Sequence, residues 1–151
     1  QKIAFIDMDK TVSTSISGLS MLKQLNNINN KNLKFLKDEE IKLKDKETKL
    51  ISQKSIISQT ELKKLTIDLK SEIKKYNQDR KKIISDFNRL KVNNTGRLLN
   101  LINPILVKFS NEKEISIILQ KKDLVIGKTE LDITDDVIKI IDTEIKEFKI
   151  K

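Results

Sequence analysis

Apolar positions recur along the chain with two different spacings. Residues 2–7 form a short apolar run rich in β-favouring residues, which predicts one opening strand. Over residues 19–51, and again from residue 60 onward, apolar residues recur mainly at steps of three and four, which predicts two helices. A polar stretch at 52–60 separates them. The pattern therefore predicts two antiparallel coiled-coil helices joined by a tip near residues 52–60.

The two helical stripes differ in length. The first contains Leu19, Leu22, Leu25, Ile28, Leu33, Leu36, Leu43 and Leu50. The second contains Leu62, Leu65, Leu69, Ile73, Tyr76, Ile83, Phe87, Leu90, Leu98, Leu101, Ile105 and Phe109. Because a proline inside a helix removes one backbone hydrogen bond, we expect a kink or break near Pro104 in the second helix.

The last third of the chain returns to β-favouring residues. Residues 115–119 and 124–126 are β-branched runs separated by a short polar stretch, which predicts two strands joined by a turn. The sequence from Asp132 to Asp136 then opens an amphipathic helix that contains Val137, Ile140, Ile141 and Ile145. At the other end, the Ser/Thr-rich residues 11–17 provide a helix cap.

These elements predict an α+β, mostly helical fold in which a long helical hairpin brings both strand regions together. We expect a small β body made of residues 1–18 and 113–151, and a helical arm made of residues 19–112. About 57 residues outside the arm are marginal for an independent core. We therefore expect the β body to be the oligomerisation region.

Composition removes much ordinary enzymology. The 151 residues include no Cys and no His, which excludes disulfides, thiol nucleophiles, the usual zinc ligands and imidazole catalysis. The net charge of +9 is unevenly distributed. Residues 52–91 have eleven basic and five acidic residues, whereas residues 130–151 have four basic and seven acidic. The basic middle would attract nucleic acid, anionic lipid or acidic polypeptide.

The chain shows no targeting or spanning segment. No run of 18 or more apolar residues occurs, so we predict no transmembrane helix. Because the chain begins at Gln1 rather than Met and enters an apolar run at once, we interpret it as a mature or trimmed product. This interpretation permits export.

Several local strings resemble the Skp (OmpH-like) family of periplasmic chaperones. They are the opening KIAFIDMDKTV, the run YNQDRKK at 76–82, Asn103-Pro104-Ile105, and DITDDVI at 132–138. The resemblance implies a jellyfish-like homotrimer whose helical arms enclose unfolded outer-membrane proteins in the periplasm without ATP. It also implies a protein that is not an enzyme and needs no cofactor, catalytic residue or metal.

Candidate binding residues lie at the tip and on the second helix. The family's arms are linked to lipopolysaccharide and anionic lipid, so the resemblance suggests a similar site at Lys74, Lys75, Arg80, Lys81 and Lys82. The alternative is a solvated charged face. Ile56 and Ile57 are candidates for client contact, or they close the end of the two-helix core.

Two other functions remain open from the residues. A basic coiled coil could be a scaffold or bind nucleic acid, but stacking platforms need several exposed aromatic residues, and we expect Tyr76 and Phe87 to pack in the helical seam. Asp7, Asp9 and Thr11 match the DxDxT motif of Mg²⁺-dependent phosphatases, with Asp135-Asp136 as a distal metal pair. That fold needs successive βα units, so we expect Asp9 and Thr11 to shape a turn instead.

Overall fold

The computed structural model describes residues 2–151 and is mostly helical, as predicted. Its elements are β1 (Ile3–Ile6), α1 (Met8–Thr14), α2 (Ile16–Gln53), α3 (Gln59–Glu112), β2 (Ile117–Gln120), the 3₁₀ turns η1 (Lys121–Asp123) and η2 (Thr129–Leu131), and α4 (Thr134–Glu144). The chain forms two compact units. Unit 1 comprises Gln1–Asn26 and Leu90–Lys151, and unit 2 comprises Asn27–Arg89.

Two helix caps arrange the chain after β1. The Asp7 carboxylate accepts a hydrogen bond from the Lys10 N–H at 2.9 Å and so caps α1, a short helix that the sequence did not predict. The helical backbone is interrupted at Ser15, whose hydroxyl accepts a hydrogen bond from the Gly18 N–H at 3.1 Å. This bond confirms the predicted cap in the Ser/Thr-rich stretch. A Cβ on Gly18 would lie 1.5 Å from the Val12 carbonyl oxygen, so only glycine fits at this position in the first turn of α2.

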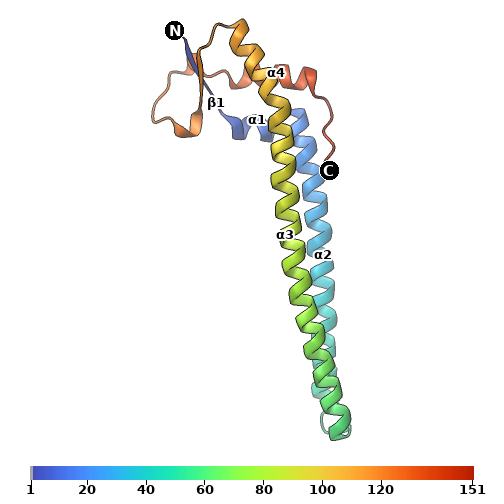
Figure 1. Cartoon of the computed structure of the whole chain (residues 1–151). Coiled ribbons are helices and arrows are strands. Elements are labelled where there is room, and N and C mark those ends of the chain that lie inside the picture. The colour runs from blue at the N-terminus through green and yellow to red at the C-terminus, as the bar shows by residue number, and fades with distance from the viewer. Residues whose placement is uncertain (1) are drawn as a thin grey trace. The chain divides into compact units, whose positions relative to one another are not determined.

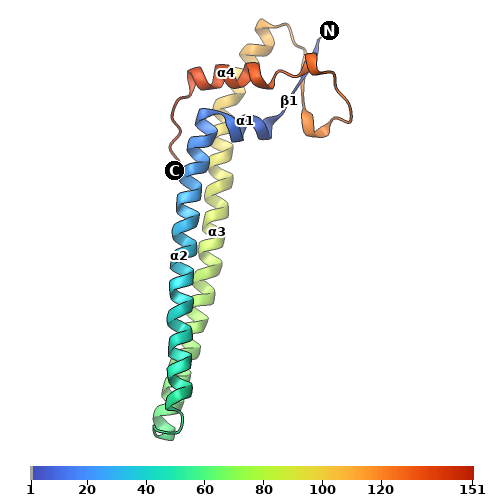
Figure 2. The ribbon, with the colours of Figure 1, turned by 180° about the vertical axis from the view of Figure 1, so that it is seen from behind.

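The helices α2 and α3 pack as a hairpin, and both views of the ribbon show them side by side (Figures 1 and 2). The seam is thin. In unit 2, Leu36 is the one buried residue, while most other seam residues are half-buried. Leu33 and Ile73 were expected in the stripe but are 57% and 41% exposed. A two-helix seam covers only a narrow line on each helix, so apolar residues to its side stay in contact with solvent.

Of the kink or break that the sequence predicted near Pro104, the break is wrong, because α3 continues through this residue to Glu112. Pro104 lies on the exposed side of the helix, where the carbonyl group that loses its partner faces solvent. On the opposite side Ile102, Ile105 and Phe109 are buried and hold the helix in place. Just beyond the end of the helix, Glu114 has a positive φ of 55°.

The strands β1 and β2 pair in parallel, with Ile3 opposite Ile117 and Ile6 opposite Gln120. The two distant strand regions therefore meet, as predicted. The expected strand at residues 124–126 is wrong: these residues form no strand, and Val125 and Ile126 are 99% and 89% exposed. The turn η1 follows β2 directly, and the chain does not return alongside β2 after it. Without a neighbouring backbone, a β-favouring run has no ladder to join.

The start of α4 joins the end of β1. The Ile133 N–H donates to the Phe5 carbonyl at 3.0 Å, and the Asp7 N–H donates to the Thr134 hydroxyl at 2.9 Å. Thr134 in turn donates to the Asp132 carboxylate from both its hydroxyl and its N–H. Burial alone would raise the pKa of Asp132, but the bonds from Thr134, together with the positive charges of Lys121 and Lys10, hold the pKa below its ordinary value.

The hydrophobic core lies in unit 1. It brings together side chains from β1, the beginning of α2, the end of α3, α4 and the C-terminal segment. The core residues are Ala4, Phe5, Ile6, Met21, Leu25, Leu98, Ile102, Ile105, Phe109, Ile115, Ile133, Val137, Ile141 and Phe148. As predicted, Val137 and Ile141 form the buried face of the last helix, and both are fully buried.

We expect Thr134→Val to destabilise the chain by about 1–3 kcal/mol, because the Asp7 N–H and the Asp132 carboxylate would both lose a buried partner. The matched control is Thr143→Val, since the Thr143 hydroxyl is exposed and bonds only within α4. Chemical denaturation measures the free energy of unfolding of both variants. Because folding lowers the Asp132 pKa, its contribution is complete above the ordinary carboxyl pKa and is lost as the pH falls through the folded value. Equal losses in the two variants would contradict this account.

Candidate functional site

The outer side of α3 in unit 2 is a continuous basic face. At roughly 100° per residue, eight cationic side chains project within about 140° of one another around the helix, on the side away from the apolar stripe. We call the following residues the basic face: Lys63, Lys64, Lys70, Lys74, Lys75, Lys81, Lys82 and Arg89. All eight are exposed, and no acidic residue of α3 lies among them.

The acidic residues of α3 in unit 2 share one flank beside the apolar stripe. They are Glu61, Asp68, Glu72, Asp79 and Asp86. Some of them face α2, as the Glu72 carboxylate lies 2.6 Å from the Lys46 ammonium group. Asp68 lines a hollow together with Lys46 and Lys49 of α2. This arrangement places compensating negative charge in the seam and leaves the basic face with an excess of positive charge.

Unit 2 therefore holds most of the positive charge of the protein. It contains seventeen basic and ten acidic residues, a net charge of +7 out of +9 for the whole chain. Within the described residues, Lys82 and Arg89 pair with Asp86, at 2.7 and 3.7 Å, whereas the other six members of the basic face form no ion pair. Surface pairs of this kind are worth little, so the face keeps its electropositive character.

The structure brings four of the five predicted basic residues together. Lys74, Lys75, Lys81 and Lys82 lie on the basic face, whereas Arg80 projects toward a different side of the helix. The sequence reasoning missed Lys63, Lys64 and Lys70, which extend the face toward the start of α3, and it missed Arg89. The sequence contained a signal for the full basic face. The acidic residues recur at steps of seven and four, which places them on a single flank of the helix and leaves the lysines on another side.

Large apolar side chains are exposed in the same unit. Ile56, in the connection between α2 and α3, is 80% exposed, while its neighbour Ile57 is half-buried. Ile67 lies among the lysines of the basic face and is 56% exposed. The remaining exposed apolar residues of this unit are Leu33, Phe35, Ile41, Ile51, Ile73 and Ile84. Unit 2 thus offers cationic and apolar contacts along the same two helices.

The aromatic residues of the second helix are half-buried in the seam. The Tyr76 hydroxyl donates a hydrogen bond to the Glu40 carboxylate on α2, and this bond raises the pKa of the phenol above its ordinary value. Phe87 is half-buried in the same way. A stacking platform for nucleic-acid bases needs exposed aromatic faces, which these two residues do not provide.

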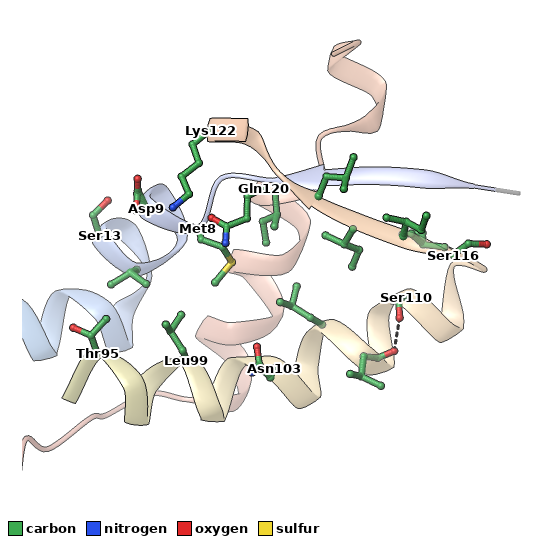
Figure 3. Close-up of a pocket in the computed structure, with 18 of the residues that line it drawn as sticks. Met8, Asp9, Ser13, Thr95, Leu99, Asn103, Ser110, Ser116, Gln120 and Lys122 are labelled. Atoms are coloured by element: carbon green, nitrogen blue, oxygen red, sulfur yellow. Dashed lines mark hydrogen bonds between the residues drawn. The ribbon is translucent and has the colours of Figure 1, made fainter. Parts of the chain in front are cut away.

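Unit 1 contains an open apolar hollow of about 710 Å³. Figure 3 shows it between α1, β2 and α3, with Met8 and Gln120 pointing toward the side of α3 that carries Leu99 and Asn103. Asp9 and Lys122 lie at its edge. Its lining is mostly apolar, so it suits an apolar partner better than a polar substrate.

The DxDxT residues serve the backbone. Asp7 caps α1, and the buried Thr11 hydroxyl donates to the Asp7 carbonyl at 2.7 Å. The expectation that Asp9 and Thr11 shape a turn is wrong, because both residues lie within the helix α1. Asp9 is exposed. Asp135 pairs with Lys10 at 2.9 Å, which raises the pKa of that lysine through the hydrogen bond and the charge of Asp135. Within residues 2–151, no three acidic side chains cluster as metal ligands.

The structure thus defines a helical-hairpin protein with a small α/β core unit and a basic, partly apolar hairpin surface. The family model for outer membrane protein (OmpH-like) matches residues 2–141, and the chain belongs to this family. No curated protein matches the chain. A crystal structure of a candidate outer membrane chaperone (OmpH-like) from Caulobacter crescentus CB15 is similar, with a TM-score of 0.83 at 18% identity, over 99% of this chain and 88% of that chain.

None of the helices in residues 2–151 combines the length and the apolar character that crossing a bilayer requires.

We expect replacement of Lys74, Lys75, Lys81 and Lys82 by Gln to lower binding to vesicles that contain phosphatidylglycerol at least tenfold. Each lysine near an anionic surface contributes about 1 kcal/mol. The matched control replaces Lys31, Lys37, Lys44 and Lys49 of α2 by Gln, which changes the net charge equally. Cosedimentation at low ionic strength measures both variants. If the two variants lose binding equally, total charge rather than the basic face determines it.

Proposed function

We propose that the chain is an ATP-independent holdase chaperone that binds unfolded outer-membrane proteins in the periplasm. The observation that supports it best is the combination, in unit 2, of the basic face with eight exposed large apolar side chains. Membership of the OmpH-like family supports the same function. No part of the proposal needs a nucleotide, a metal or a catalytic group.

An unfolded polypeptide requires a binding surface that tolerates many sequences. Long-range attraction by lysines raises the rate of encounter with acidic segments and does not depend on their order. Scattered apolar side chains then provide contacts of modest strength, because each buried methylene contributes about 0.8 kcal/mol. A thin seam with one buried residue, Leu36, allows the two helices to adjust to different clients.

The same surface fits a second kind of anion. Phosphate groups of lipopolysaccharide or of anionic lipid would interact with Lys74, Lys75, Lys81 and Lys82 through the same charges. In the proposed function, such contacts would hold a loaded chaperone near a membrane surface. Nucleic acid would bind weakly and without specificity, because Tyr76 and Phe87 are half-buried and a single exposed aromatic residue, Phe35, does not make a stacking platform.

We also propose that the functional particle is a homotrimer, in which residues 1–18 and 113–151 associate and the arms, residues 19–112, surround a cavity for the client. A two-stranded sheet is marginal by itself. Ile3 and Ile117 on the paired strands are 46% and 51% exposed, and Val125 and Ile126 are almost fully exposed. These side chains and the apolar hollow beside β2 support association of unit 1 with other copies.

The proposed function is tested by diluting a urea-unfolded outer-membrane protein into buffer with and without the chain. We expect the chain to suppress light scattering at a stoichiometric ratio without nucleotide. The variant with Gln at Lys74, Lys75, Lys81 and Lys82 should suppress it less, whereas the matched α2 variant should retain the effect. Unchanged scattering in the presence of the unaltered chain would rule out the holdase function.

The proposed trimer is tested by sedimentation equilibrium. We expect a mass three times that of the 17.5 kDa chain. Replacing Val125 and Ile126 together by Ser should shift the mass toward one chain, because it removes apolar surface from the proposed contact. The control is Ile67→Ser in unit 2, which should leave the mass unchanged. A single-chain mass for the unaltered protein would overturn the proposed assembly.

A further inference from the structure

The last residues of the chain lie extended along α2 and α3 within unit 1. Both ribbon views show this segment leaving α4 and running beside α2 (Figures 1 and 2). Its side chains alternate: Phe148 is buried at 3% exposure and Ile150 is half-buried, whereas Glu147 and Lys149 are exposed. Residues 146–151 make no hydrogen bond to another backbone group among the described residues. The segment is therefore held by side chains alone.

The amide group of Gln24 on α2 takes the place of a neighbouring strand. Its Nε2 donates to the Phe148 carbonyl at 2.5 Å, and its Oε1 accepts from the Ile150 N–H at 3.1 Å. The Ser20 hydroxyl donates to the same Phe148 carbonyl at 3.1 Å. A side-chain amide offers one donor side and one acceptor side, as a peptide group does, so Gln24 pairs with the segment as a strand would.

Asn94 on α3 also pairs through its side-chain amide with the backbone of the segment, at Lys151. Its Oδ1 accepts from the Lys151 N–H at 3.0 Å, and its Nδ2 donates to the Lys151 carbonyl at 3.1 Å. Arg97 donates to the Lys149 carbonyl at 3.1 Å and to the Asn94 Oδ1 at 2.6 Å. The Arg97 guanidinium also lies 4.9 Å from the centre of the Phe148 ring. We call Ser20, Gln24, Asn94 and Arg97 the amide groove.

The amide groove recognises main chain rather than sequence. Six hydrogen bonds from these four residues reach backbone atoms of the segment, and a single fully buried side chain, Phe148, enters the core. Asn94 is itself fully buried. Emptying the groove would leave Asn94 and the half-buried Gln24 without these partners, and water would have to enter the groove to replace them. Exchange of one occupant for another is therefore easier than an empty groove.

We infer that the amide groove is a binding site for an extended polypeptide segment with a large apolar side chain, occupied in this structure by the chain's own C-terminal segment. The competing occupant is a stretch of unfolded client, so the inference rests on the proposed chaperone function. The attached segment has an effective concentration in the millimolar range. A client displaces it only when other contacts, such as those with the basic face, raise the client's local concentration similarly.

The first test needs no client. A labelled peptide with the sequence of residues 145–151, IKEFKIK, is titrated against the full chain with Phe148→Ala and against the unaltered chain, with fluorescence anisotropy as the readout. We expect binding to the Phe148→Ala chain and at least tenfold weaker binding to the unaltered chain, whose groove is already occupied. The matched peptide IKEAKIK should bind the Phe148→Ala chain at least tenfold more weakly than IKEFKIK does.

A second substitution in the Phe148→Ala chain checks the hydrogen bonds. Gln24→Glu turns the donor to the Phe148 carbonyl into an acceptor and should abolish peptide binding, whereas Gln53→Glu, at an exposed position of α2, should not. Circular dichroism verifies that both chains remain helical. No peptide binding to the Phe148→Ala chain, or equal binding of the two peptides, would overturn the site.

Hydrogen–deuterium exchange tests displacement in the unaltered chain. Adding equimolar unfolded outer-membrane protein should accelerate exchange of the Ile150 and Lys151 amides at least tenfold, because these amides lose their bonds to Gln24 and Asn94. If scattering is suppressed while this exchange stays slow, exchange with a client is overturned and the chaperone function stands. If scattering is not suppressed, the proposed function fails and the peptide titration alone decides whether the groove binds peptide.

Discussion

Pairing between residues more than one hundred positions apart is the interaction on which unit 1 depends. The strand β1 has one partner strand, β2, and its carbonyl at Phe5 and its following N–H at Asp7 bond to the start of α4. None of these contacts is local, and each of them closes a loop of more than one hundred residues that contains α2 and α3. The entropy of closing such a loop rises slowly with length, which makes a hairpin of this size thermodynamically acceptable. Its many internal helical bonds are local and can form before closure.

The two units distribute apolar residues in opposite ways. Unit 1 buries nearly all of the core, from Phe5 to Phe148, whereas unit 2 buries only Leu36. A helix pair with so little burial gains stability mainly from a narrow seam and a few cross-helix contacts such as Lys46 to Glu72. Its remaining side chains are free to contact other molecules. In this chain the scarcity of apolar residues thus separates a part that holds the fold from a part that is available for binding.

Much of this architecture could be predicted from the sequence, because it depends on period and local chemistry. The helical spacing and the polar stretch between the long helices predicted the hairpin, and the Asp132-Ile-Thr sequence predicted the start of α4. Residues 124–126 could not be placed, since a strand exists only beside another backbone. Pro104 was misjudged because its effect depends on which side of the helix faces solvent. Both errors concern tertiary context, which a single sequence does not contain.

The basic face and the amide groove also differ in how far the sequence alone reveals them. Clustered lysines and the regular spacing of the acidic residues are both visible in the sequence, and the structure adds the contact of the acidic flank with α2. Gln24 and Asn94 are separated by 70 positions and are ordinary polar residues in two helical patterns. Only the packed structure aligns their amides with one extended segment. As proposed, both sites would recognise features that every unfolded chain possesses, namely charge and main-chain amides, and neither would depend on a particular order of side chains. A surface built in this way can bind many polypeptides with modest affinity for each, which is the physical requirement of a holdase.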